Sequence, residues 1–294
     1  MITSIGEVLI DMIAVEEGPL EGVKVFEKHP GGAPANVAVG LARLGVPVAL
    51  VSKVGDDPFG RFLVEKLREE KVDVSNVLID EVKHTGVTFV QLRGAKPEFM
   101  LYDGVAYFNI KPEELIKVPP SDLMHFGSVL FSREPSRSSL FRYLRKARES
   151  GAILSYDVNL RRDLWKDERS MIKDVERAVK LADIIKLSDS ELSYLERRGI
   201  YVFDAPLVAV TKGERGCEIH HDGEHVDVPA YPVKPVDTTG AGDAFTAALL
   251  AWLWRGGLSL SLNREEMREM GRFANRVAAL STLRRGAWSV PRGL

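Results

Sequence analysis

The sequence predicts an α/β protein whose mainly parallel β-sheet is covered by helices on both faces. Along most of the chain, short apolar runs alternate with helical patterns of ten or more residues, which is the order that parallel strands with helical crossovers require. Two segments, 14–32 and 86–105, are strand-like and lead into no helical pattern. We therefore expect one α/β domain over residues 1–294, in which these two segments form a small separate sheet.

The expected elements follow one another in a regular order. The N-terminal residues 1–15 read as the first strand. Each of the next strands gives way to a helical pattern: 48–55 precedes a helix near 58–70, 123–130 one near 135–149, 152–159 one near 170–181, and 183–188 one near 189–197. A further strand, 206–213, precedes a hairpin, and the stretch DTTGAGDAFTAALLAWL (237–253) runs into a long apolar helix.

Composition excludes several classes of protein. Apolar residues make up 45% of the 294 residues, enough for a sizeable core, and the net charge of −2 offers no basic surface for nucleic acid. The one cysteine, Cys217, rules out an intramolecular disulfide framework. No apolar run approaches the roughly 18–20 residues that span a bilayer, and the N-terminus lacks the basic start of a signal peptide. We expect a cytoplasmic protein that binds neither nucleic acid nor membrane.

Polar side chains stand at the ends of the expected strands, where parallel sheets bind their ligands. They are Asp11, the group at 55–57, Asp157, Asn159, Ser188 and Thr211. Such residues also cap helices and shape turns, so each alone has an ordinary explanation. Several of them at one edge of a sheet favour a binding site.

The stretch DTTGAGDAF places glycines and an acid at the start of an apolar helix. Gly240 and Gly242 expose backbone N–H groups at the positive end of the helix dipole, which favours an anion. Asp243 lies in the first turn, where we expect it to be ionised and able to accept a proton. Amides for an anion beside a base suit phosphoryl transfer to a hydroxyl. The alternative is an ordinary glycine-rich helix start; no GxxxxGK[ST] motif is present, which excludes a P-loop protein.

Two stretches resemble the signatures of the ribokinase family, the phosphofructokinase B type of carbohydrate kinases. DTTGAGDAF resembles the C-terminal signature, and GGAPANVAVGLARLG (31–45) resembles the N-terminal one. They lie about 200 residues apart in the family's order, and the resemblance covers essentially the whole chain. It implies a ribokinase-like fold, ATP and Mg²⁺ as cofactors, and a role for the small sheet as a lid over the sugar.

The resemblance also implies roles for individual residues. Asp243 matches the catalytic base, and the amides of Gly240, Ala241 and Gly242 match the anion hole. Arg161, in DVNLR, matches a residue that approaches the phosphoryl group or the sugar. The positions that match sugar-binding residues are Asp11, Gly31, Gly32 and Asn36. A carboxylate and a carboxamide can bond adjacent hydroxyls, and the glycine pair would let a ligand approach the backbone closely.

The nucleotide and metal positions follow in the same way. KLSDSE falls where the family has an Asn-x-x-Glu motif linked to magnesium, with Ser188 in place of the asparagine and Glu191 retained to hold Mg²⁺ through water. The resemblance places ATP beside Lys186, Ser188, Thr211, Gly213, Gly216, Asn275 and Ala278. A monovalent cation such as K⁺ is implied near Asp237 and Thr239, with the backbone near Gly286.

The substrate is left open among several sugars. Tyr102 and Asp103 fall in the lid, where an aspartate would repel an acid sugar, although Arg93 and Lys96 lie nearby. We expect fructose first, 2-keto-3-deoxygluconate second, and ribose or a nucleoside third. The lid implies a homodimer. A non-catalytic sugar or nucleotide sensor is the alternative from another class, while an NAD-dependent oxidoreductase lacks its GxGxxG motif.

Overall fold

A large sheet and a small sheet organise the chain. The computed structural model describes residues 1–16, 18–93 and 96–294, without the side chains at 92–99. Within that part, the large sheet has the strand order β13-β12-β11-β10-β9-β8-β1-β4-β5. Its strands are β1 (Ile2–Ile5), β4 (Val48–Gly55), β5 (Val77–Asp80), β8 (Leu123–Phe126), β9 (Ile153–Asp157), β10 (Ile184–Ser188), β11 (Leu207–Thr211), β12 (Cys217–His221) and β13 (Glu224–Val228). Pairing is parallel from β5 to β11, and the β12–β13 hairpin adds an antiparallel edge.

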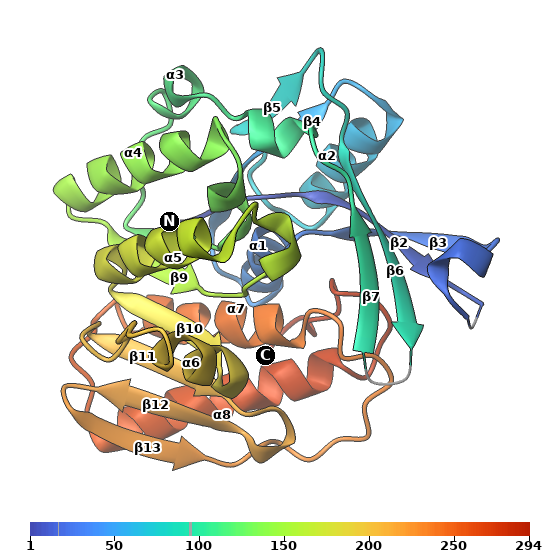
Figure 1. Ribbon diagram of the computed structural model, residues 1–294. Helices are drawn as coiled ribbons and strands as arrows, with labels where there is room; N and C mark the ends of the chain where they lie inside the picture. The colour runs from blue at the N-terminus through green and yellow to red at the C-terminus, as the bar shows by residue number, and fades with distance from the viewer. Residues whose placement is uncertain (17, 94–95) are drawn as a thin grey trace.

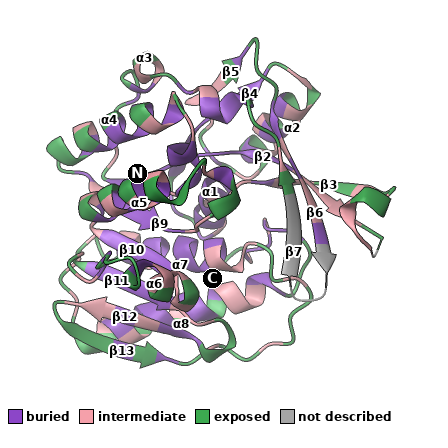
Figure 2. Cartoon of the chain, in the orientation of Figure 1, coloured by how far each residue is buried: buried purple, intermediate pink, exposed green. Residues whose placement is uncertain are grey.

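Helices cover both faces of the large sheet, as the alternating sequence predicts (Figure 1). One hydrophobic core lies under α1 (Ala33–Arg43), α2 (Pro58–Glu69), α7 (Ala241–Arg255) and α8 (Arg264–Ser281). A second core lies on the other face, under α3 (Pro112–Leu115), α4 (Ser136–Glu149), α5 (Glu168–Leu181) and α6 (Asp189–Glu196). The strands between the two layers are largely buried (Figure 2). The α/β class and the predicted helices after β4, β8, β9 and β10 are therefore confirmed.

Short 3-10 helices fill several connections. They are η1 (Leu20–Gly22), η2 (Ala106–Asn109), η3 (Val129–Ser132), η4 (Arg162–Leu164) and η5 (Gly213–Arg215). The strand expected at 123–130 is shorter than predicted, because the chain turns into η3 after Phe126. None of the helices in the described ranges is long and apolar enough to cross a membrane.

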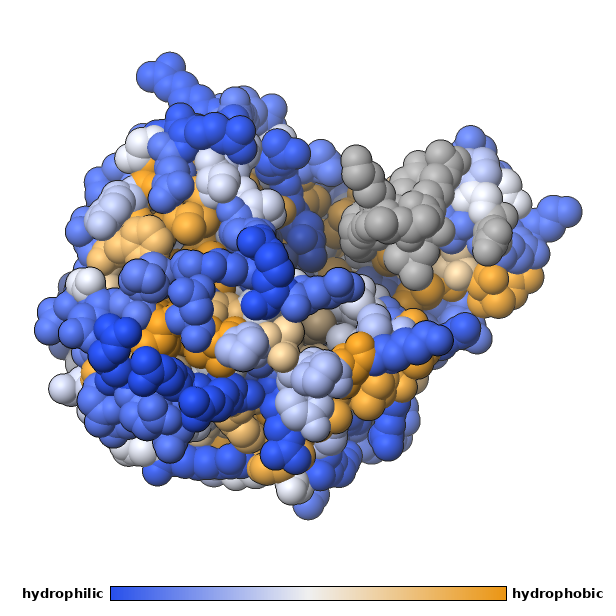
Figure 3. Space-filling model, turned by 90° about the horizontal axis from the view of Figure 1, so that it is seen from below, coloured by the Kyte–Doolittle hydropathy of each residue, from blue (hydrophilic) through white to orange (hydrophobic). Residues whose placement is uncertain are grey.

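The small sheet stands to one side of the large one and has the order β3-β2-β6-β7. Its strands are β2 (Leu9–Ala14), β3 (Phe26–Gly31), β6 (Gly86–Arg93) and β7 (Lys96–Leu101). β2 pairs with β6 in parallel, and the outer pairs are antiparallel. In the space-filling view from below, hydrophilic residues (blue) cover much of the surface, with hydrophobic residues (orange) between them (Figure 3).

The N-terminal segment differs from the prediction of one strand over residues 1–15. β1 belongs to the large sheet and β2 to the small one, so the lid begins at Leu9 rather than at residue 14. The chain leaves the large sheet at Gly6, where an added Cβ would lie 2.2 Å from Cγ of Pro34. Asp11 is consequently in the middle of lid strand β2, paired with His29, and does not follow a strand of the large sheet.

Candidate active site

A cavity of about 920 Å³ opens between the small sheet and the loops at one edge of the large sheet. The lid contributes side chains from β2, β3, β6 and β7. The body contributes the residues after β1 and β9, the first turns of α1 and α7, and the C-terminal loop at 285–286. Among the predicted site residues, the lining includes Asp11, Gly32, Asn36, Arg161, Asp237, Thr239, Gly240 and Asp243. Residues far apart in the sequence thus meet at the edge where α/β proteins bind ligands.

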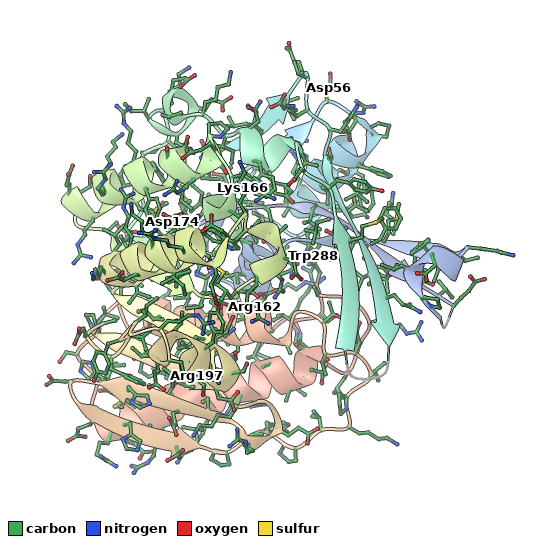
Figure 4. The ribbon with its side chains drawn as sticks, viewed as in Figure 1. Asp56, Arg162, Lys166, Asp174, Arg197 and Trp288 are labelled. Carbon is green, nitrogen blue, oxygen red and sulfur yellow. The ribbon has the colours of Figure 1, made fainter. Side chains whose placement is uncertain are left out.

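Asp243 is the buried acid of this cavity. Nδ2 of Asn36 donates to its Oδ2 at 2.7 Å, and Nε1 of Trp288 donates to Oδ1 of Asn36 at 2.9 Å, so the carboxamide is held at both ends. Trp288 (labelled in Figure 4) comes from the C-terminal loop. Burial and then the charge of Asp157 raise the pKa of Asp243 to about 6. The positive end of the helix dipole favours a lower pKa, but burial and the charge of Asp157 outweigh it. The carboxylate is still mainly ionised at neutral pH.

The loop before α7 is shaped by two glycines. Gly240 is the N-cap and has a φ of 74°, and an added Cβ would lie 2.7 Å from Cβ of Ala287. No side chain caps the helix, which leaves its first turn open to an anion. The sequence predicts that the amide of Ala241 is a free donor. In the structure it donates to the carbonyl of Thr238 at 3.1 Å. The amides of Gly240 and Gly242 make no comparable bond within the described ranges.

A buried lysine lies against this loop. Nζ of Lys186 is 3.1 Å and 3.3 Å from the two carboxylate oxygens of Asp157, and it would lie 3.0 Å from a Cβ added to Gly242. Oγ1 of Thr246 donates to the same carboxylate at 3.1 Å. Although burial opposes it, the charge of Asp157 raises the pKa of Lys186, so the side chain is an ammonium ion. The open amides therefore have a fixed positive charge beside them.

The part of the cavity that is predicted to hold the sugar is acidic. Burial raises the pKa of Asp11 to about 7, against the nearby charge of Arg161, and burial raises that of Glu7 to about 7 as well. Glu7 was not singled out from the sequence, although it lines the cavity beside Asp11. Arg161 is close enough to lower the pKa of Asp243 as well as those of the two other acids. Three carboxyl groups and one guanidinium thus share this end.

The glycine pair permits close contacts within the protein. An added Cβ at Gly31 would lie 2.0 Å from Oδ2 of Asp11, and one at Gly32 would lie 2.5 Å from the carbonyl oxygen of Glu7. Gly32 also has a φ of 100°, a region that side chains disfavour. The carboxylate of Asp11 and the backbone of Glu7 therefore occupy the space that a side chain at either position would need.

Ser188 and Glu191 form a capping box at the start of α6. The amide of Ser188 donates to Oε2 of Glu191 at 2.8 Å, and the amide of Glu191 donates to Oγ of Ser188 at 3.2 Å. The amide of Leu160 donates to the other oxygen, Oε1, at 2.7 Å. Glu191 therefore joins α6 to the loop that carries Arg161.

The other predicted nucleotide residues lie outside this cavity, beyond the first turn of α7. Thr211 ends β11, and the turn after it includes Gly213 and Gly216, with φ of 57° and 94°. Nδ2 of Asn275 donates to the carbonyls of Val228 and Pro229, and an added Cβ at Gly216 would lie 2.0 Å from the same Val228 carbonyl. Ala278 follows on α8, half-buried. These residues thus gather around the ends of β11 and β13.

Asp237 links two loops at the rim of the cavity. Its carboxylate accepts from the amides of Thr239 and Gly286, both at 2.9 Å. Although burial opposes it, these two N–H groups hold the pKa of Asp237 below its ordinary value. The three positions predicted to surround a monovalent cation are therefore adjacent.

Tyr102, predicted to contact the substrate, does not line the candidate cavity. Its side chain is 53% exposed and lines a separate hollow of about 570 Å³ with Phe59, Phe89 and Asp103. Asp103 is paired with Nη2 of Arg133 at 2.9 Å and does not line the candidate cavity. The side chains of Arg93 and Lys96 lie outside those that the structure describes. The lid argument for a neutral sugar therefore has no support from these residues.

Comparison with known proteins agrees with this geometry. Residues 1–291 match the model of the pfkB family carbohydrate kinases. The uncharacterized sugar kinase PH1459 of Pyrococcus horikoshii is 52% identical over 99% of this chain and 95% of that one, with a TM-score of 0.93 to its ATP complex. Fructokinase-1 of Zea mays is 38% identical over 98% of this chain and 93% of its own length.

A solved structure with sugar bound is also similar. A double mutant of the fructokinase from Vibrio cholerae O395, bound to fructose, ADP and a potassium ion, is 33% identical, with a TM-score of 0.87 over 99% of this chain and 95% of that one. The family model, these relatives and the open helix start beside a buried acid all agree. The chain therefore belongs to the pfkB family of carbohydrate kinases and is a sugar phosphotransferase.

Proposed function

We propose that the protein transfers the γ-phosphate of ATP to a hydroxyl of a neutral sugar, with fructose as the first candidate. The observation that carries the neutral sugar is the charge of the cavity, whose lining has six acidic side chains, including Glu7, Asp11 and Asp243, against the two guanidinium groups of Arg161 and Arg285. Because Asp243 is mainly ionised and Glu7 and Asp11 are partly ionised at neutral pH, the carboxylate of an acid sugar would meet like charge there. The fructokinase relatives support fructose among neutral sugars.

The geometry suits an in-line transfer. Asp243 takes the proton of the sugar hydroxyl while the hydroxyl oxygen forms a bond to the γ-phosphorus and the bond to the departing ADP breaks. The amides of Gly240 and Gly242 and the ammonium of Lys186 stabilise the charge of the phosphoryl group as it moves. Asp11 and Asn36 hold sugar hydroxyls, and the lid keeps water, a competing acceptor, away.

The nucleotide enters from the side of β11 and α8. We place its adenine near Asn275 and Ala278 and its phosphates along Thr211, Gly213 and Ser188 toward α7. Mg²⁺, which neutralises phosphate charge, would arrive with ATP. Because both carboxylate oxygens of Glu191 already accept protein N–H groups, this residue fits a contact through water and not a direct bond to the metal.

A panel of sugars tests the substrate. In an assay that couples ADP release, we expect the kcat/KM for fructose to exceed that for 2-keto-3-deoxygluconate, ribose or a nucleoside by at least tenfold, on the order of the 1–3 kcal/mol that pocket contacts supply. Turnover of the acid sugar alone would show that the charge argument is wrong. Binding of sugar and ATP without any ADP release would instead favour a sensor.

Potassium is expected to support activity through Asp237. An acceptor carboxylate between two loops at the anion site suits a cation that orders both loops. Replacing K⁺ by tetramethylammonium should lower kcat several-fold, and added K⁺ should restore it. An Asp237→Asn variant should lose this response, whereas equal rates in both salts would contradict the proposal.

The lid is also proposed to pair two copies of the chain. Large apolar side chains of the lid segments are exposed, including Val15, Val25, Met100 and Tyr102 at 43–53%, and their burial would favour association. Light scattering should give a mass of about twice 32.6 kDa. A single-chain mass at micromolar concentration would exclude this pairing.

A further inference from the structure

Glu7 provides a helix cap from a distant part of the chain. It follows β1, is only 4% exposed and belongs to neither family signature. Helix α1 begins after Gly32, which has no side chain to cap it. Oε1 of Glu7 instead accepts from the amide of Ala33 at 3.1 Å, across 26 residues of sequence. A carboxylate at this end of a helix satisfies an open N–H group and favours the dipole.

The segment around Glu7 also contacts the start of α1 through its backbone. Gly32 lies against the carbonyl of Glu7, with no room for a Cβ. Oγ of Ser4 donates to the carbonyl of Pro34 at 2.8 Å, and the ring of Pro34 packs on Gly6. The first turn of α1 is therefore held by both side-chain and backbone atoms of residues 4–7.

One turn further on, α1 carries the residue that contacts the proposed base. Asn36 donates to Asp243 at 2.7 Å and accepts from Trp288 at 2.9 Å. Since both ends of its carboxamide are bonded, a shift of α1 would break one contact or rotate Asp243. The position of the acid thus depends on how α1 is seated.

We propose that Glu7 is a positioning residue for phosphoryl transfer: by holding the first amide of α1 it places Asn36, and Asn36 orients Asp243 toward the sugar hydroxyl. This inference rests on the proposed role of Asp243 as the base. Small displacements of a catalytic group have large effects on rate, so the effect of Glu7 should be on turnover more than on substrate binding.

The charge of Glu7 acts on the same site. The ionisable groups that interact with it are Asp243 on α7, Arg161 after β9 and Tyr107 on η2, with Asp11 on β2 in the same cavity. Burial raises the pKa of Glu7 to about 7, above that of Asp243 at about 6, so Glu7 is mostly neutral at the pH where Asp243 titrates. The cap can therefore be tested by two variants, one that removes the acceptor oxygen and one that keeps it.

Steady-state kinetics of Glu7→Ala and Glu7→Gln, with whichever sugar the wild-type protein phosphorylates, test the inference. Glu7→Ala removes the acceptor, and we expect kcat to fall at least tenfold while KM for sugar and ATP changes less than threefold. Glu7→Gln keeps an acceptor oxygen, so kcat should stay within about threefold of wild type.

A cap of another helix is the matched control. Asp167 caps α5 by accepting from the amide of Ser170 at 2.8 Å, away from the cavity. Asp167→Ala should lower the melting temperature and leave kcat unchanged. The inference is overturned if Glu7→Ala behaves like Asp167→Ala, or, should Glu7→Ala not fold, if the kcat of Glu7→Gln falls more than threefold below that of wild type. A wild-type protein without sugar kinase activity would instead refute the proposed function.

Discussion

Replacement of Asp243 by asparagine is expected to lower kcat by about 10²–10⁴-fold, the usual contribution of a general base, while fructose and ATP still bind. The amide has nearly the same shape and can still accept from Nδ2 of Asn36, which Asp243 does at 2.7 Å. It cannot take a proton from a hydroxyl at neutral pH. Single-turnover kinetics together with calorimetric titration of each ligand separate the loss of chemistry from a loss of binding.

The pH dependence of the wild-type protein gives a second measure of the same acid. With a pKa of about 6, Asp243 becomes protonated as the pH falls through 6, so kcat should decrease on that side and reach a plateau above pH 7. The contribution of Asp243 to the free energy of unfolding changes with pH in the opposite direction to kcat. Because the folded pKa lies above the ordinary value of 3.8, the unfolded chain loses its proton first, and the fold is destabilised as the pH rises from about 4 to 6.

The control for Asp243→Asn is Glu168→Gln, an isosteric change of an exposed acid in the first turn of α5. It should alter neither kcat nor its pH profile. Asp243→Asn should also unfold at an equal or higher temperature at pH 7, since it removes an ionised buried carboxylate. Retention of more than a tenth of the wild-type kcat would show that another group accepts the proton.

The sequence predicted the helices well, because short patterns of neighbouring residues determine where a helix begins. Asp57 and Pro58 together form an N-cap and a first-turn proline, and α2 begins there. The Ser188-x-x-Glu191 spacing is also a local signal, since it is typical of a capping box. We had interpreted it only through the family's magnesium motif, and the structure shows the cap.

The parts of the site that the sequence did not reveal depend on contacts between distant segments. At the break between β1 and β2, Gly6 lies against Pro34, which is 28 positions further along the chain, and no periodicity in residues 1–15 marks it. Glu7 caps a helix from 26 residues away, so its role is invisible in a local pattern. Tyr102 lines the other hollow because it follows β7, and the sequence does not tell which face of the lid it will join.

Replacement of Lys186 by methionine is expected to reduce both stability and turnover. The side chains of Lys186 and Asp157 are 10% and 3% exposed, so the change leaves a buried carboxylate without its cation. Breaking such a pair costs about 3–5 kcal/mol, which urea unfolding would show as a lower midpoint at unchanged slope. The exposed pair of Lys66 and Glu69 is the control, because Lys66→Met should leave the midpoint nearly unchanged.

A second substitution separates the two effects of Lys186. Asp157→Asn added to Lys186→Met removes the unpaired charge and keeps an oxygen for Oγ1 of Thr246, which donates to Asp157 at 3.1 Å. We expect the double variant to regain most of the lost stability but little of the lost turnover, because the ammonium beside Gly242 is still missing. Recovery of turnover together with stability would show that Lys186 serves the fold alone. Since the helix dipole and this ammonium act on the same anion site, the stable double variant measures how much of the phosphoryl charge is stabilised without the ammonium.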